Sequence, residues 1–229
     1  MKKDIMKAFK LMRYGVMVKE NFLMMVIFFI AGTVLEMMGF GVQIEDATSS
    51  YGRFIGSVFI LCAAMFPGQL LVSTSLASLV QTSSYKKRIQ TSMLAKLNVF
   101  CNFTAVTWIV FLRLVHGLVY HEDMAGQMDS LLLTGLFVLL FNLFGINMYK
   151  YFVASIFIIV FFSMTFQILD NWLSGGYAPA VFHLHPLLAV GFSYGMLIVG
   201  GLLSYWISKA VYKKELSRIA FGTAAAKQI

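Results

Sequence analysis

The chain has 229 residues, of which 59% are hydrophobic and only 12% are charged. Soluble domains carry about 25% charged residues, so this composition excludes a single water-soluble core and predicts an integral membrane protein. A net charge of +8 would suggest nucleic acid as a partner in a soluble protein. Here the charges lie between apolar runs, so we expect the lipid bilayer and no nucleic acid as the partner.

Residues 1–20 are predicted to form an amphipathic helix on the inner surface of the membrane. The segment carries six lysines and arginines, and Ile5, Phe9, Met12 and Val16 recur at helical spacing. Such a helix places its apolar side in the interface and its cations toward lipid phosphates. A disordered basic tail is the alternative interpretation.

Six apolar segments are long enough to cross a bilayer, which takes about 20 helical residues each. Residues 170–186 lack cations and contain two glycines and two prolines. This stretch is too broken to span and too apolar for an ordinary loop, so a re-entrant or interfacial hairpin is predicted. The fold class is therefore all-α, with residues 1–229 in one transmembrane domain. The predicted spans are residues 22–40, 54–80, 97–118, 131–148, 152–169 and 187–207.

The distribution of cations predicts the orientation. All lysines and arginines except Arg53 and Arg113 lie in the N-terminal segment, in residues 81–96 and 149–151, or in the C-terminal tail. Segments rich in Lys and Arg stay on the cytoplasmic side. Both termini are therefore expected in the cytoplasm, and the membrane is expected to be the plasma membrane of a bacterium. The segments expected outside are residues 41–53, 119–130 and 170–186.

Residues 81–96 form the longest polar break in the first half of the chain and contain four cations and no acid. Residues 85–94 are predicted to form a short helix, in which Ile89, Met93 and Leu94 share an apolar face. This helix is either a docking element for a cytosolic partner or a solvated loop that only fixes the topology. The residues expected to contact the partner are Tyr85, Lys86, Lys87, Arg88, Ile89, Gln90 and Met93.

The second predicted span contains Pro67 and Gly68, which predict a kink or hinge. Below them lie Gln69 and a run of serines and threonines, polar enough to face protein or a water-filled cavity. Span six carries Gly191 and Gly195, a GxxxG pattern that close helix packing explains, with a moving seam between helices as the alternative.

Glu36 and Arg113 are charged residues inside predicted spans. Counted at 1.5 Å per residue, they lie about 21 Å and about 24 Å above the inner ends of spans one and three. This similar depth predicts an ion pair between helices, because unpaired charges are costly in hydrocarbon. A substrate contact is the alternative role.

Motifs for catalysis or cofactor binding are missing from the sequence. The chain has no GxxxxGK[ST] loop for ATP and no HExxH pair. His183 and His185 fall short of the three or four ligands that a metal site needs. No enzymatic activity, metal or cofactor is expected on this chain.

The basic N-terminal helix, the loop at residues 83–91 and the broken hairpin before the last span resemble small permease subunits of ABC transporters, of the ABC-2 exporter type. This resemblance implies two permeases, identical or different, and two cytosolic ATPase subunits that hold ATP and Mg. The N-terminal helix and first cytoplasmic loop of such permeases contact the ATPases, so residues 85–94 would be the coupling helix. The implied activity is export of an amphipathic or hydrophobic substrate (a peptide, lipid or drug).

Two other classes of function compete with this interpretation. One is the substrate-binding membrane subunit of an energy-coupling-factor importer, which needs a deep polar pocket. Little polarity is found here outside the second span. The other is a membrane enzyme or a scaffold that transports nothing. Co-purification of an ATPase whose activity depends on this chain would separate a transporter from an enzyme.

Overall fold

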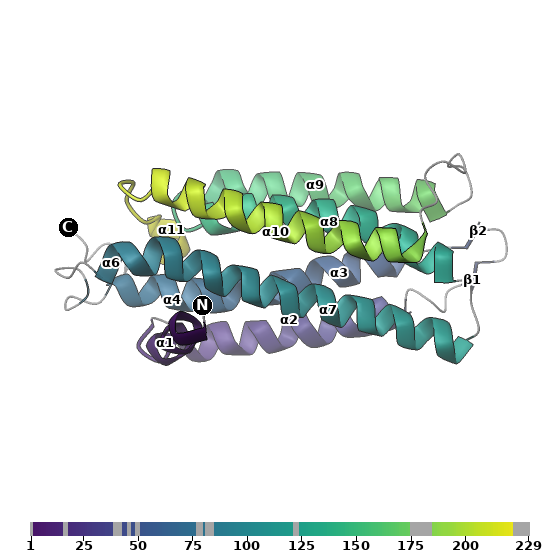
Figure 1. The fold of residues 1–229 in the computed structure, drawn as a ribbon, viewed down its shortest axis with the longest axis horizontal. Helices are drawn as coiled ribbons and strands as arrows, with labels where there is room; N and C mark the ends of the chain where they lie inside the picture. The colour runs from purple at the N-terminus through teal and green to yellow at the C-terminus, as the bar shows by residue number, and fades with distance from the viewer. Residues whose placement is uncertain are drawn as a thin grey trace.

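The computed structural model describes residues 2–15, 18–38, 43–44, 47–48, 51–76, 80, 85–120, 124–174 and 185–221. Long helices run side by side along one axis, and a short N-terminal helix lies across one end of them (Figure 1). In chain order the elements are α1 (Lys2–Met12), α2 (Val18–Met38), β1 (Gln43–Ile44) paired antiparallel with β2 (Ala47–Thr48), α3 (Tyr51–Ala63), α4 (Phe66–Ser73), the 3-10 turn η1 (Thr74–Leu76), α6 (Tyr85–Arg88), the π-helical turn η2 (Ile89–Met93), α7 (Leu94–Tyr120), α8 (Met124–Asn147), α9 (Phe152–Ser174), α10 (Pro186–Ala210) and α11 (Arg218–Phe221).

The chain is a multi-pass membrane protein. Five apolar segments in the described part are long enough to cross a bilayer: Val18–Met38, Phe54–Leu76, Tyr85–Val119, Phe152–Asp170 and Pro186–Ala210. Helix α8 contains a shorter apolar stretch, Leu131–Gly145. Along α9, Phe157 is 72% exposed and Ile168 is 70% exposed. Soluble monomers rarely show contiguous apolar surface of this kind, whereas lipid covers it.

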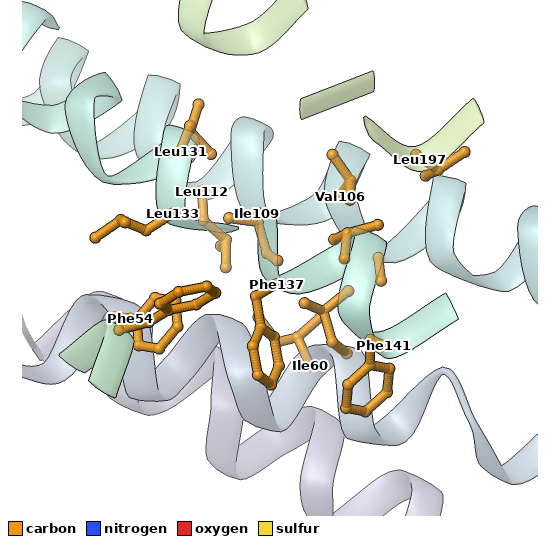
Figure 2. Packing of buried hydrophobic residues seen from close by; sticks show 14 of the residues in the cluster. Phe54, Ile60, Val106, Ile109, Leu112, Leu131, Leu133, Phe137, Phe141 and Leu197 are labelled. Atoms are coloured by element: carbon orange, nitrogen blue, oxygen red, sulfur yellow. The ribbon is translucent and has the colours of Figure 1, made fainter. Parts of the chain in front are cut away.

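The core lies where α3, α7, α8, α9 and α10 meet, and Figure 2 shows its side chains from close by. Phe137 of α8 is its centre: its ring lies 5.7 Å from that of Phe54 and 5.3 Å from that of Phe141. Phe166 of α9 adds a third ring at 6.2 Å. Since lipid tails are as apolar as these side chains, close packing rather than escape from water holds such helices together.

Small residues let several helices approach closely. A Cβ added at Gly56 of α3 would lie 2.5 Å from the amide nitrogen of Glu36 in α2, and one at Gly200 would lie 3.0 Å from Asn142. Gly191 and Gly195 differ, because an added Cβ there meets no atom of the described residues within 4 Å. The interpretation of this GxxxG as a helix-packing motif therefore finds no partner in the described part of the chain and stays a prediction. Helix α10 makes its close contacts with α8 at Ser193, beside Gly135, and again around Gly200.

The N-terminal amphipathic helix is shorter than predicted. Helix α1 ends at Met12, and α2 already begins at Val18, so Lys19 belongs to the first long helix. The chain turns at Gly15, where an added Cβ would lie 2.6 Å from the hydroxyl of Ser73 in α4. This close approach to α4 fixes the position of the turn.

The predicted polar loop at 81–96 is largely helical. From Tyr85 onward, α6, η2 and α7 follow one another without a break, so the expected separate helix is the first part of the third long helix. The segment 119–130, which the sequence predicts to lie outside, is also mostly helical, because α7 ends at Tyr120 and α8 begins at Met124. The first five residues of the predicted hairpin at 170–186 continue α9, and residues 175–184 lie outside the described residues.

Candidate functional site at the basic end of the bundle

The basic end of the bundle is organised around Asp4, in the first turn of α1. Its carboxylate accepts hydrogen bonds from Lys96 of α7 and from Arg88 of α6, each at 2.6 Å. These bonds, with Lys96 contributing most, lower the pKa of Asp4. The Arg88 and Lys96 side chains stay 46% and 39% exposed, and ion pairs this accessible add little stability. Their effect is positional, since they hold α1 against the start of the third long helix.

Four of the seven predicted coupling residues are available to a partner. Tyr85, Lys87 and Arg88 are exposed, and Lys86 is half-buried. The guanidinium of Arg88 lies 5.7 Å from the ring centre of Tyr85, and the Lys87 ammonium lies 6.0 Å from that of Tyr212. These aromatic contacts orient the cations without neutralising them.

The other three predicted coupling residues, Ile89, Gln90 and Met93, are buried inside the chain. Ile89 is 0% exposed and Met93 is 1% exposed. Both pack in one cluster with Ala8 and Met12 of α1 and with the leucines of α4. The expectation that they present an apolar ridge to a partner was therefore wrong. Helix α1 covers that face, and the ridge instead joins α6 and η2 to α1 and α4.

Gln90 belongs to a polar chain that joins three parts of the bundle. Its amide donates to the hydroxyl of Ser75 in η1 at 2.8 Å, and its oxygen accepts from the ammonium of Lys150 at 3.0 Å. Lys150, in the α8–α9 turn, also donates to the backbone carbonyls of Tyr212 and Lys214 beyond α10. Burial lowers the pKa of Lys150 to about 8, and Lys86 adds a smaller effect.

The predicted hinge in the second span corresponds to a break in the helix. Helix α3 ends at Ala63, and α4 starts at Phe66 with Pro67 in its first turn. The carbonyl of Met65, at the break, accepts a hydrogen bond from the buried hydroxyl of Tyr149 at 3.2 Å. A Cβ at Gly68 would lie 2.8 Å from that hydroxyl, so glycine leaves room for the tyrosine. The polar run below the break faces the protein, and Ser73, Thr74 and Ser75 each bond a carbonyl three residues back.

Glu36 and Arg113 form an ion pair away from this basic end. Arg113 Nε donates to Glu36 Oε1 at 2.8 Å, and both side chains are 0% exposed. Ser57 of α3 donates to the other carboxylate oxygen at 3.0 Å and lies 3.2 Å from Arg113 Nη2. The triad links α2, α3 and α7. Arg113 lies 25 residues after Arg88 on the same continuous helix, a separation of about 37 Å.

Several residues of this site escaped the sequence analysis, although one left a signal. Asp4 is the single acid within residues 1–19, which carry six cations, and such an acid invites pairing with cations elsewhere. Ser57 gave no signal, because a serine in an apolar run has many local partners.

The arrangement of this site is suited to binding. It presents cations and aromatic rings on helices that are tied to each other. The described residues contain no group of three His, Cys, Asp or Glu side chains that could hold a metal ion. His185, considered above as a ligand, accepts a hydrogen bond from the amide of Leu187 at the start of α10. No protein-family model, curated protein or solved structure matches the chain.

Proposed function

We propose that this chain is the membrane-spanning permease subunit of an ATP-driven ABC exporter. Separate cytosolic ATPase subunits bind ATP and Mg, and a second permease, identical or different, completes the path. The cargo is an amphipathic or hydrophobic molecule. Six helical passes cross the membrane, with α8 as the fourth, and both termini lie in the cytoplasm.

The observation that carries this proposal is the joining of α1 to the basic start of the third long helix. The Asp4 pairs with Arg88 and Lys96 make one surface of two segments far apart in the sequence. In Figure 1, α1 and α6 lie at the same end of the bundle, with α11 close by. These are the two segments through which an ATPase would act on a permease of this type.

The internal contacts suggest how a force on this surface reaches the spans. Ile89 and Met93 pack against α4, so movement of α6 carries α4 with it. The Ser75–Gln90 bond adds a second connection between these helices. Since α4 is separated from α3 by the break before Pro67, the lower part of the second span can swing while α3 stays in place.

The test is to co-purify the chain with the ABC ATPase encoded beside it and to measure ATP hydrolysis in lipid vesicles. Tyr85→Ala combined with Lys87→Glu changes two exposed residues and should weaken the complex by about tenfold, which corresponds to about 1.4 kcal/mol. Lys209→Glu, an exposed charge reversal at the end of α10, is the matched control and should have little effect. Equal ATPase association and stimulation for all three proteins would refute the proposal.

A further inference from the structure

A cavity of about 350 Å³ lies between α1, α2, the α3–α4 break and α7. Its volume is within the range of about 300–1,000 Å³ that is typical of small-molecule sites. Ile60, Ala63 and Ala105 are buried and form its floor, whereas Phe9, Phe29 and Phe100 are 44%, 39% and 40% exposed. The cavity is therefore a groove that opens to the outside of the bundle.

The lining of this groove is apolar. The hydroxyl of Thr104 is already bonded to the carbonyl of Phe100 at 2.9 Å. The rest of the wall consists of the Cys101 side chain and of apolar aliphatic and aromatic side chains. A ligand here gains contact with hydrocarbon and few hydrogen bonds, which selects a flexible apolar chain over a sugar, nucleotide or peptide backbone.

The groove runs along the membrane-spanning helices from the level of α1. From Pro67 to Ile60 its wall follows seven residues of the second span, or about 10 Å. This is about a third of the hydrocarbon thickness of a bilayer. Phe9 of α1 contributes to the wall and packs edge-on against Phe100, with ring centres 6.2 Å apart. The interfacial helix and the groove therefore form one continuous surface.

Two cations lie close in sequence to Phe9, at this end of the groove. Arg13, in the turn just after α1, follows Phe9 by four residues, which brings it near the same side of the chain, and Lys10 precedes Arg13 by three residues, so the two cations are neighbours. Both side chains are exposed, and neither forms an ion pair within the described part of the chain. The nearby acid Asp4 is already engaged by Arg88 and Lys96. An anion supplied from outside the chain would complete the site.

We propose that the groove binds an anionic phospholipid, with one acyl chain between α2 and α7 and its phosphate at Lys10 and Arg13. The apolar lining selects the chain and the two cations select the charge, so neither a neutral lipid nor a soluble anion satisfies both parts. The lipid wedges against the α3–α4 break and holds α1 in the interface. This site does not depend on the exporter function proposed above.

The experiment uses the full chain in a neutral detergent, with phosphatidylglycerol and phosphatidylcholine of identical acyl chains as probes. Lipid adducts are counted by native mass spectrometry, and the thermal midpoint is recorded during titration. Phosphatidylglycerol should bind with a stoichiometry near one and raise the midpoint, and phosphatidylcholine should do so far less. Lys10→Gln combined with Arg13→Gln should reduce affinity for phosphatidylglycerol by roughly fivefold per cation. Lys209→Gln combined with Lys213→Gln, which removes two exposed cations from the end of α10 and the segment after it, should leave the affinity unchanged.

The groove itself is tested by Thr104→Phe, which places a ring at its exposed rim and should abolish the saturable binding. Thr165→Phe is the matched control, because Thr165 of α9 bonds the carbonyl four residues back in the same way as Thr104 and lies outside the groove. Equal binding of both lipids, or undiminished binding after Thr104→Phe, would overturn the proposal. So would an equal loss of affinity in the Lys209 and Lys213 control.

Discussion

Replacing Glu36 by glutamine tests whether its ion pair with Arg113 stabilises the bundle. Both side chains are fully buried and Arg113 Nε lies 2.8 Å from Glu36 Oε1, so the substitution removes the negative charge that Glu36 places beside a buried guanidinium. An arginine cannot escape by releasing its proton. Breaking a buried pair in this way typically costs about 3–5 kcal/mol.

The reverse change, Arg113→Met, should cost less. The carboxyl group left behind can take up a proton, and it still has the Ser57 hydroxyl as a partner at 3.0 Å. The loss is then that of a hydrogen bond to a charged group, about 1.5–3 kcal/mol. For a chain of this size each kcal/mol shifts the thermal midpoint by about 2–4 °C. We therefore expect losses of roughly 10 °C for Glu36→Gln and roughly 5 °C for Arg113→Met.

The double variant decides the interpretation. With both charges of the pair removed, neither side chain remains as a buried ion, so the double variant should melt close to Arg113→Met and above Glu36→Gln. The assay is thermal unfolding in detergent followed by size-exclusion chromatography. Met37→Leu and Leu114→Met change the neighbouring residues, which are 37% and 39% exposed, and serve as controls with little expected shift. If the two single losses simply add, the pair contributes nothing and the reasoning fails.

Two further variants test packing and charge elsewhere. Gly201→Leu should prevent correct folding, since even a Cβ there collides with the Val99 side chain. Gly195→Leu places its side chain in open space and should change the melting temperature by no more than about 2 °C. Size-exclusion profiles of the two variants provide the comparison. Burial lowers the pKa of Lys150 to about 8 from its ordinary 10.5. Between pH 8 and pH 10.5 the unfolded chain therefore binds more protons than the folded one, and the folded protein should become more stable as the pH rises through this range. Lys150→Gln should flatten that rise, and an unchanged pH profile of thermal melting would contradict the expected titration of Lys150.

The sequence was sufficient to predict features that follow from the bilayer as a solvent. Apolar length located five of the spans, and the similar depths of Glu36 and Arg113 anticipated a pair that the structure contains. Both inferences work because hydrocarbon penalises polar groups so strongly that few arrangements survive. The break at Pro67 was predictable for a similar reason, since proline has no amide hydrogen to donate.

What the sequence could not provide was the competition between partners within the chain. The apolar face of Ile89 and Met93 looks the same whether a cytosolic protein or α1 covers it. The polar residue Gln90 is likewise compatible with solvent or with a buried bond to Ser75. The Gly191–Gly195 pattern permits close packing but does not show which helix packs there, and no described residue lies within 4 Å of an added Cβ at either glycine. Periodicity identifies a face, and only the three-dimensional arrangement assigns its neighbour.

The break in the second span separates two halves that are anchored differently. Ser57 ties α3 to the Glu36–Arg113 pair, whereas Ser75 ties the end of the α4 segment to Gln90. A continuous helix would force these anchors to move together. The break removes that constraint. Pro67 maintains the break, because a residue with an amide hydrogen at this position could extend the hydrogen-bonded ladder of α3.

Pro67→Ala should therefore make the second span more continuous. We expect unchanged or slightly higher thermal stability together with a loss of ATPase stimulation in the co-purified complex. Pro186→Ala is the matched control, because Pro186 also lies in the first turn of a helix, α10, and no described helix ends directly before it. A stiffened span raises stability and impairs coupling at once, which a simple packing defect does not do. If Pro67→Ala lowers the thermal stability and leaves ATPase stimulation normal, the break serves packing. Independent movement of α3 and α4 would then be refuted.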